Sequence, residues 1–321
     1  MVPAEIKGEP ITVLGELALS PYAEGLTPAQ ISARQNLNKV TIPEGIRYIY
    51  LSAFRGCEKL KELNLPESLL EVIATAEDDA ERILSKVPAE QQKYLYACVH
   101  AYQNCAFQNQ ELHIPEGVET IGIAAFKGCT GLRRIIFPST LKHISYSAFW
   151  GCANLEQIVL PDGLSTIGEY AFRECKSLRE ITIPSSVTHL RNQAFYNCES
   201  LQTVNLPDCL QEIGPTVFCE CVNLQEITIP AGIKMIPKSA FCGCARLQKV
   251  ALPAGLESIE EHAFADSLDN EMTLSDIFIP ESVKHIHQYA FGYEPRVTIY
   301  AIPGSYAEKR MKELGYRVIT V

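Results

Sequence analysis

Apolar residues recur along most of this chain with a fixed period, and a proline marks each period. Counted from each proline, apolar residues lie six, three and one positions before it and three and six positions after it. Alanine, phenylalanine and cysteine follow at positions ten, eleven and fourteen. The unbroken series, in steps of 23 residues, is Pro115, Pro138, Pro161, Pro184, Pro207, Pro230 and Pro253, with Pro43 and Pro66 upstream and Pro280 and Pro303 downstream. Such self-similarity predicts a solenoid, in which each coil buries its apolar residues against its neighbours.

Each period predicts two short extended segments and a tight reversal of the chain. In one period the spacing of the repeat places apolar residues at Ile135 and Phe137, on either side of Ile136. This alternation indicates a short strand with one face toward the core. Pro138 ends this strand because proline donates no ladder hydrogen bond. A second extended segment covers 141–144, and Ala148-Phe-x-x-Cys152 predicts either a helical turn or a tight bend.

The aromatic position should form one buried column, because like positions of stacked coils lie above one another. Its members are Phe54, Phe126, Phe149, Phe172, Phe195, Phe218, Phe241, Phe264 and Phe291.

Cysteine is a residue with reactive chemistry, and most cysteines of this chain recur at one fixed position of the repeat. Eight of the 12 cysteines occupy that position, where a thiol serves as a small apolar group facing inward: Cys57, Cys105, Cys129, Cys152, Cys175, Cys198, Cys221 and Cys244. The others are Cys98, Cys209, Cys219 and Cys242. Cys219 and Cys242 share an outward phase on adjacent coils, and a coil spacing of about 4.8 Å leaves an exposed disulfide open. Within Cys219-x-Cys221 one thiol should face in and the other out, so we expect no metal site there.

The two ends of the chain predict caps. Residues 1–36 read as an N-terminal cap with a degenerate first repeat, in which Thr27-Pro28-Ala29-Gln30 begins a helix. Residues 304–321 read as a C-terminal cap, in which Ser305 to Glu308 form a capping box, the helix ends at Gly315, and 316–321 is a strand.

The array between the caps, 37–303, contains two insertions. The larger, at about 67–101, predicts two helices over 74–86 and 89–103, and it serves either binding or local support. The smaller, near 269–272, predicts a loop.

The charge balance disfavours some partners. With 28 basic and 38 acidic residues the net charge is −10, so we expect no nucleic-acid partner. No apolar run reaches the roughly 18 residues that cross a bilayer. Residues 1–19 lack the basic and apolar regions of an export signal, so we expect no export signal in this chain. We also expect the protein to be a monomer.

Two surface stripes are candidate binding residues. One residue after the aromatic column come Lys127, Trp150, Arg173 and Tyr196. Trp, Tyr and Arg are the residue types that dominate interfaces, although the first three residues also suit a cation–π stack that covers the turn. On the strand face, Arg134, Gln157 and Glu180 belong to a mixed polar stripe, which suits either binding or simple solvation. The sequence contains no phosphate-binding loop, nucleophile elbow or metalloprotease motif. We therefore expect no enzyme, no catalytic residue, no metal and no cofactor.

The pattern Leu-x-x-Ile-x-Ile-Pro, followed by Ile and then Ala-Phe-x-x-Cys, resembles the BspA-type leucine-rich repeat, also called the Treponema pallidum type. The resemblance covers about 37–303, and Gly304-Ser305-Tyr306-Ala307-Glu308 resembles the C-terminal closure of that family. It differs from the general leucine-rich pattern in placing cysteine later, in the turn. The resemblance implies a leucine-rich-repeat solenoid, and proteins that are secreted or lie on the surface of anaerobic bacteria or mucosal protists, often in adhesion.

Three functions follow as hypotheses. The first is a non-enzymatic, adhesin-like interaction module whose rigid, elongated surface binds a protein or a glycan. The second is a structural or scaffolding segment of a larger surface protein, without a ligand of its own. The third and weakest is a metal-binding or hydrolytic protein that acts through the insertion.

Overall fold

The fold is described from a computed structural model. It covers residues 25–44, 111–267, 272–293 and 296–321, several short strands upstream of residue 73, and the single residues Leu19, Cys57 and Lys59. The chain divides into two compact units, 1–175 and 176–321, and each is described by itself.

Each coil in the described repeats of unit 1 carries a three-residue strand before its proline position and a two-residue strand after it. The first kind comprises β4 (Lys39–Thr41), β6 (Glu62–Asn64), β8 (Glu111–His113), β10 (Arg134–Ile136) and β12 (Gln157–Val159). The second comprises β5 (Tyr48–Ile49), β7 (Glu71–Val72), β9 (Thr120–Ile121), β11 (His143–Ile144) and β13 (Thr166–Ile167). The two extended segments predicted for each period are thereby confirmed. Near the N-terminus, β3 (Val13–Leu14) pairs in parallel with β5, and β1 (Glu5–Ile6) pairs antiparallel with β2 (Glu9–Pro10).

Unit 2 repeats this arrangement. Its strands before the proline are β14 (Glu180–Thr182), β16 (Thr203–Asn205), β18 (Glu226–Thr228), β20 (Lys249–Ala251), β22 (Asp276–Ile279) and β24 (Thr298–Ala301). Those after it are β15 (His189–Leu190), β17 (Glu212–Ile213), β19 (Met235–Ile236), β21 (Ser258–Ile259) and β23 (His285–Ile286), and β25 (Val318–Thr320) closes the unit.

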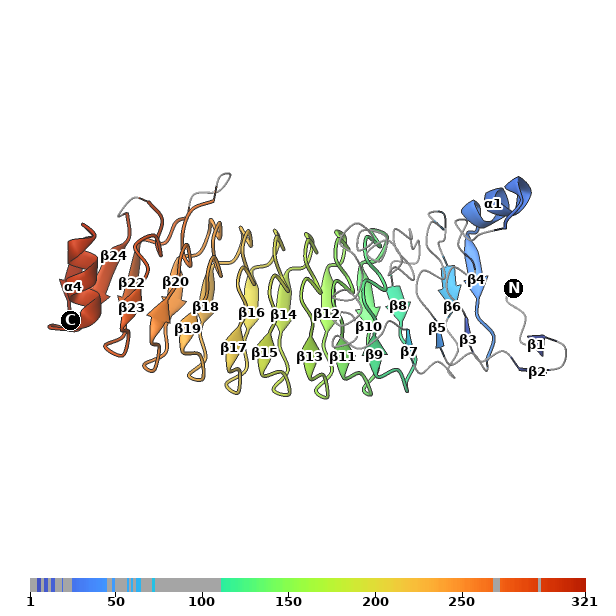
Figure 1. Ribbon diagram of the computed structural model, residues 1–321, viewed down its shortest axis with the longest axis horizontal. Helices are drawn as coiled ribbons and strands as arrows, with labels where there is room; N and C mark the ends of the chain where they lie inside the picture. The colour runs from blue at the N-terminus through green and yellow to red at the C-terminus, as the bar shows by residue number, and fades with distance from the viewer. Residues whose placement is uncertain are drawn as a thin grey trace. The chain divides into compact units, whose positions relative to one another are not determined.

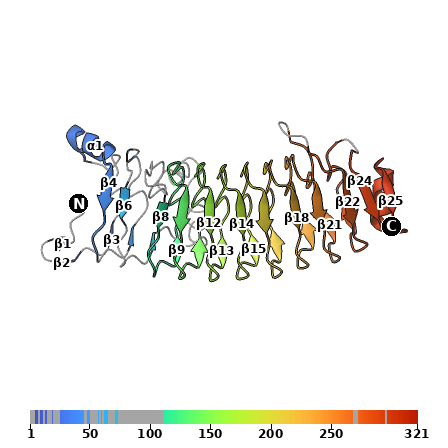
Figure 2. The same cartoon turned by 180° about the vertical axis from the view of Figure 1, so that it is seen from behind.

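Like strands of successive coils pair in parallel and in register. Arg134 lies opposite Gln157 and Ile135 opposite Ile158, so each residue faces its counterpart one repeat later. Figure 1 shows the coils of unit 1 following one another in sequence order from β8 to β12, and Figure 2 shows the same order from behind. Within the described repeats the structure is therefore a parallel-strand solenoid with a repeat of about 23 residues, as predicted.

The large insertion does not separate the coils on its two sides. Glu71 pairs with Thr120 and Val72 with Ile121, although Pro66 and Pro115 are 49 residues apart. β7 therefore joins β5 to β9 in one parallel sheet, as Glu71 also pairs with Tyr48. The predicted helices over 74–86 and 89–103, and residues 268–271 of the smaller insertion, lie outside the described residues.

The phenylalanines stack into a buried column within each unit. In unit 1 the ring centroids of Phe126 and Phe149 are 5.4 Å apart, and those of Phe149 and Phe172 are 5.3 Å apart. In unit 2 consecutive rings from Phe195 to Phe291 are separated by 5.7, 5.8, 5.4 and 5.6 Å. The prediction of stacked rings holds in each unit, and Phe54 lies outside the described residues.

The reversal after the second strand is a series of tight turns, which decides between the two predicted alternatives. Around Phe149, Trp150 N donates to Ser147 O at 3.0 Å and Cys152 N donates to Phe149 O at 3.1 Å, each bond spanning three residues. Ser147 and Gly151 have φ values of 55° and 74°. A left-handed residue on each side of the phenylalanine prevents the helix from continuing. Backbone bonds between coils, such as Phe126 N to Ala148 O at 2.8 Å, hold the turns in register.

The turn cysteines are buried, as predicted, and they also make a bond that the sequence did not suggest. Cys152 Sγ donates to Phe126 O on the preceding coil at 3.0 Å, and Cys244 Sγ donates to Phe218 O at 3.2 Å. Burial raises the pKa of Cys152 to about 12, so this thiol stays protonated and unreactive. Cys98 and Cys105 lie outside the described residues.

The predicted outward position of Cys219 is wrong. Its exposed fraction is 7%, because Cys242 on the next coil lies against it and the two thiols form a hydrogen bond. Cys242 is partly exposed, Cys209 is exposed, and all three are free thiols.

The capping box predicted for the first helix is present, and the one predicted for the last helix forms only in part. Helix α1 spans Pro28–Gln35, and Thr27 and Gln30 form the reciprocal capping box. Helix α4 spans Tyr306–Glu313, and Glu308 N donates to the Ser305 hydroxyl at 3.2 Å. The Glu308 carboxylate accepts from Gly304 N at 2.6 Å, one residue before the expected partner.

Candidate functional site

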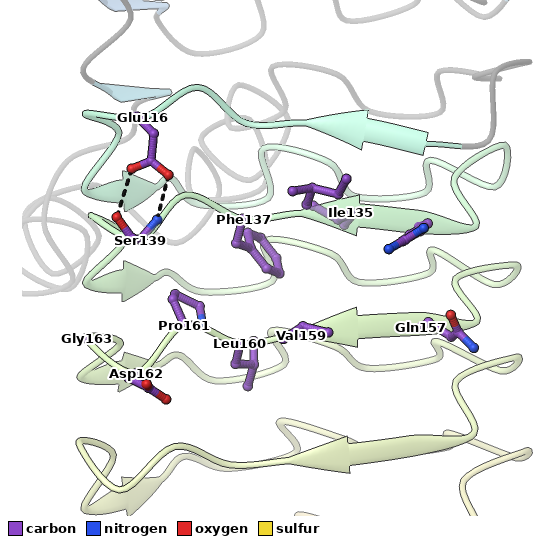
Figure 3. Close-up of a pocket in the computed structure, with 12 residues that line it drawn as sticks. Glu116, Ile135, Phe137, Ser139, Gln157, Val159, Leu160, Pro161, Asp162 and Gly163 are labelled. Atoms are coloured by element: carbon purple, nitrogen blue, oxygen red, sulfur yellow. Dashed lines mark hydrogen bonds between the residues drawn. The ribbon is translucent and has the colours of Figure 1, made fainter.

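A shallow groove of about 590 Å³ lies on the outer face of β10 and β12 in unit 1. Figure 3 shows it crossing the two strands and the segments that follow them. Its lining is Glu116, Arg134, Ile135, Ile136, Phe137, Ser139, Gln157, Val159, Leu160, Pro161, Asp162 and Gly163.

The strand geometry decides which side chains reach the groove. In β12 the burial alternates, so Ile158 faces the core while Gln157 and Val159 face out. The parallel register places Arg134 beside Gln157. Two of the residues predicted from the sequence, Arg134 and Gln157, are therefore neighbours in this groove.

The middle of the groove is apolar. Val159 is 80% exposed, the highest fraction among the exposed large hydrophobic residues in the described part of the chain. Figure 3 shows Val159 and Leu160 between Gln157 at one end of the strand and Asp162 beyond the other end. Phe137 is half-buried and packs edge-on against Phe149 of the aromatic column, with their ring centroids 5.7 Å apart. The apolar floor is thus fixed to the core below it.

The ends of the groove are polar and ordered by hydrogen bonds. The Glu116 carboxylate accepts from Ser139 N at 3.1 Å and from the Ser139 hydroxyl at 3.0 Å. At the other end Arg134 Nη1 lies 3.3 Å from Glu111 Oε2. An apolar centre with a polar rim is the usual anatomy of a protein interface.

The second predicted stripe forms a cation–π stack in unit 1. Lys127 Nζ lies 3.6 Å from the centroid of the Trp150 ring, and Arg173 Cζ lies 5.0 Å from it. Tyr170 stacks on the same indole at a centroid distance of 6.0 Å. Burial lowers the pKa of Lys127, Arg173 lowers it further, and Glu174 opposes both. Because cations and a tyrosine ring already contact the indole, a ligand would meet mainly its edge.

The other predicted residues belong to unit 2. Glu180 is exposed at the start of β14, and Tyr196 is half-buried in the turn after Phe195. Each keeps the repeat position of its counterparts in unit 1.

Sequence reasoning missed the apolar part of the groove. The sequence does show that Val159 stands at an outward position of the repeat. It does not show how much more exposed Val159 is than the residues beside it on the neighbouring strands. Glu116 and Asp162 follow their prolines in loops, so no strand pattern singled them out.

Two features are absent from the part of the chain whose side chains are described. Over that part of the chain, no three His, Cys, Asp or Glu side chains gather in a way that could hold a metal ion. Over the same part, no helix is long and apolar enough to cross a bilayer.

Solved structures that are similar to this chain come from several bacteria. A leucine-rich repeat protein from Bacteroides ovatus is 25% identical with a TM-score of 0.61, and the match covers 88% of this chain and 59% of that one. This chain therefore spans less than two thirds of that relative. A leucine-rich repeat protein of T. pallidum is 23% identical, with a TM-score of 0.42 and coverages of 69% and 75%. A leucine-rich cell surface protein from Faecalibacterium prausnitzii is 23% identical, with a TM-score of 0.47 and coverages of 97% and 89%.

No curated protein matches the chain. The family model described as the BspA type leucine-rich repeat region matches in six copies, over residues 30–76, 98–221 and 166–298. These matches cover most of the sequence, and they agree with the repeat of prolines, stacked phenylalanines and turn cysteines. The chain belongs to the BspA-type leucine-rich repeat family.

Proposed function

We propose that this protein is a non-enzymatic, adhesin-like interaction module that binds a protein segment in the groove over β10 and β12. The observation that carries the proposal is the exposure of Val159, 80%, at the centre of a groove with a polar rim. Folded proteins expose scattered apolar residues, but an apolar floor enclosed by polar groups is typical of a binding surface.

The chemistry of the groove favours a protein segment over a glycan. Its centre is aliphatic, with Val159 and Leu160, and its one aromatic ring, Phe137, is held edge-on against the core. Sugar rings bind best on open aromatic faces, whereas apolar side chains of a peptide fill aliphatic depressions. Arg134, which is paired with Glu111, and Gln157 supply a cation and an amide at one end, and Glu116 and Asp162 supply carboxylates at the other. A segment with opposite charges at its two ends would complement both.

The cation–π stack is the second part of the proposed surface. Lys127, Trp150 and Arg173 stand on consecutive coils, and the two cations hold the indole in place. The stack presents two positive charges and an aromatic edge in a rigid arrangement, which lowers the entropy lost on binding. Tyr196 and Glu180 hold the same repeat positions in unit 2, and we propose them as candidate binding residues of that unit by itself.

Val159→Asp tests the groove directly. Peptides selected from a displayed random library against the full chain serve as the probe, and their affinity is measured by calorimetry. A carboxylate at the apolar centre must be desolvated when a peptide binds, so the affinity should fall by at least tenfold, which corresponds to about 1.4 kcal/mol. Arg134→Glu should weaken the same peptides by reversing the charge at the rim.

Thr228→Asp is the matched control. Thr228 holds the position of Val159 in a coil of unit 2, at the exposed end of β18. It should leave both the affinity and the melting temperature unchanged. Selected peptides that bind Val159→Asp as well as they bind the native protein would refute the groove. A library that yields no binder would favour the structural segment without its own ligand.

Surface display is part of the proposal and rests on family resemblance. In intact cells of the source organism, added protease should remove an epitope inserted in the C-terminal cap. Complete protection of that epitope until the cells are lysed would contradict surface display.

A further inference from the structure

Four aromatic side chains gather on two consecutive coils of unit 2, namely those of His262, His287, Tyr289 and Tyr293. The ring centroids of Tyr289 and Tyr293 are 4.9 Å apart, and that of His262 lies 5.5 Å from that of Tyr293. The His287 ring lies 5.7 Å from that of Tyr289. His262 N donates to Tyr289 O at 3.1 Å, a bond that holds the two turns in register. We call these four residues the tyrosine–histidine cluster.

The repeat does not require rings at these places. His262 and Tyr289 hold the position nine residues after a proline, which the three preceding coils of unit 2 fill with Gln193, Thr216 and Ser239. Those coils form the same turns and the same backbone bonds to their neighbours, such as Thr216 N to Lys238 O at 3.0 Å. The cluster is therefore an addition to the scaffold and not a part of its core.

The cluster presents aromatic surface to solvent. Tyr293 is 77% exposed, and the other three residues are partly exposed. Gly292, with a φ of 92°, turns the chain directly before Tyr293. A phenol ring that is so exposed adds little to the packing of the coil, and its open surface is available to a ligand.

Hydrogen-bonding groups accompany the rings. Tyr289 N donates to His287 Nδ1 at 3.2 Å, so the neutral imidazole carries its proton on Nε2 and donates from there. His262 Nε2 is buried and has no hydrogen-bond partner in the described part of the chain. The exposed Tyr293 ring stands edge-on to that imidazole, at 66°, and it has room to turn when a ligand seats against it. A ligand hydroxyl would then supply the missing partner.

The charges near the cluster are paired. Glu261 directly precedes His262, and the backbone of Asp266 lies 4.0 Å from a Cβ placed at Gly292. Each carboxylate of this region has a basic partner: Lys238 for Glu261, His285 for Glu260 and Arg296 for Asp266. The surroundings therefore offer no unpaired charge to attract an ionic ligand.

These properties together favour a neutral sugar. The face of an aromatic ring carries partial negative charge, and one side of a β-hexopyranose presents only C–H groups, which carry partial positive charge. The hydroxyl groups around the edge of the sugar match imidazole N–H groups and phenol hydroxyls. A peptide side chain would need an aliphatic depression, and a quaternary ammonium would need an unpaired carboxylate beside the rings.

We propose that the tyrosine–histidine cluster binds a neutral, β-linked glycan, with one hexopyranose stacked on the ring of Tyr293 and its hydroxyls bonded to His287 Nε2 and the Tyr289 hydroxyl. The site belongs to unit 2, and its ligand class differs from that of the groove in unit 1.

The experiment measures binding of three neutral oligosaccharides, cellopentaose, chitopentaose and β-galactopentaose, to the full chain by calorimetry and saturation-transfer NMR. At least one should bind, with the strongest saturation on the protons of one face of a pyranose ring. Tyr293→Ala should weaken that sugar by at least tenfold, which corresponds to about 1.4 kcal/mol. Tyr293→Phe keeps the ring and should stay close to the native affinity.

Two controls separate this site from other surfaces. Tyr306 is also exposed, at the start of α4, and it makes no ring contact with a described residue, so Tyr306→Ala should bind the sugar as the native protein does. Val159→Asp, which tests the groove, should also leave sugar binding unchanged. A failure of the groove and a failure of this site are therefore distinguishable.

Three results would overturn the proposal. The first is that none of the three oligosaccharides binds at millimolar concentration. The second is equal affinity of Tyr293→Ala and the native protein for the sugar, with melting temperatures that show intact folding. The third is tighter binding of tetramethylammonium than of every sugar, with loss of that binding in Tyr293→Ala, which would identify a cation site instead.

Discussion

At the scale of single residues, backbone conformation explains what the repeat requires in its turns. The residue two positions after the column phenylalanine has a positive φ in several coils, with 74° at Gly151, 60° at Glu174 and 61° at Glu220. Glycine adopts this conformation without strain, whereas other residues incur a cost there. The array tolerates glutamate at this position because bonds between coils hold the turn.

Gly151→Ala isolates that cost. A Cβ at Gly151 would meet Gly128 at 3.7 Å, an ordinary contact, so only the left-handed backbone penalises alanine. We expect a loss of about 1–2 kcal/mol in the free energy of unfolding, measured by denaturant titration. Gly163→Ala, at a glycine without a positive φ and with its nearest contact at 3.6 Å, should change the stability little. Equal losses in the two variants would contradict this explanation.

At the scale of elements, local signals were sufficient where the interactions are local. The capping box of α1 is set by Thr27 and Gln30, three residues apart, and it appears as the sequence predicted. Cys219 was placed wrongly because its exposure depends on Cys242, which lies 23 residues away and on another coil. Val159 was overlooked for a related reason, since the groove around it is built by two strands and their loops. The pattern thus predicted strands, turns and caps, whereas contacts between coils needed the structure.

The C-terminal cap should respond to acid through Glu308. Its pKa is lowered by the bond from Lys312 Nζ, at 2.7 Å, and then by the bond from Gly304 N, at 2.6 Å. A carboxylate with a lowered pKa stabilises the folded state above its ordinary value of 4.5, and that contribution is lost as the pH falls through the lowered pKa. In an NMR titration the Gly304 amide should therefore shift with a midpoint below 4.5.

Glu308→Gln provides the control for this titration. The amide still accepts a hydrogen bond but does not ionise, so the shift of the Gly304 amide should be flat over the same pH range. A native midpoint at or above 4.5 would show that these bonds do not act on the carboxylate.

At the scale of the molecule, stability follows from the repetition of one coil. Because like strands pair in register, each apolar position of the repeat forms a buried column of side chains within a unit. Each outward position forms a row of surface side chains with the same spacing. At the groove, the cation–π stack and the pair of Cys219 and Cys242, outward or half-buried repeat positions carry residue types that differ from those of most other coils. Because each coil contacts its neighbours along the array, the free energy of unfolding of the array is approximately a sum. Its terms are the stability of each coil and the stability of each interface between adjacent coils.

Denaturant unfolding of Phe218→Ala tests the stacking of coils most directly. Phe218 is fully buried, and its ring centroid lies 5.7 Å from that of Phe195 and 5.8 Å from that of Phe241. Removing the ring leaves a cavity between two coils, so we expect a loss of about 3–5 kcal/mol in the free energy of unfolding. Thr228→Ala, on the exposed face of the same unit, should cost far less. An unfolding midpoint of Phe218→Ala equal to that of the native protein would contradict the stacked column.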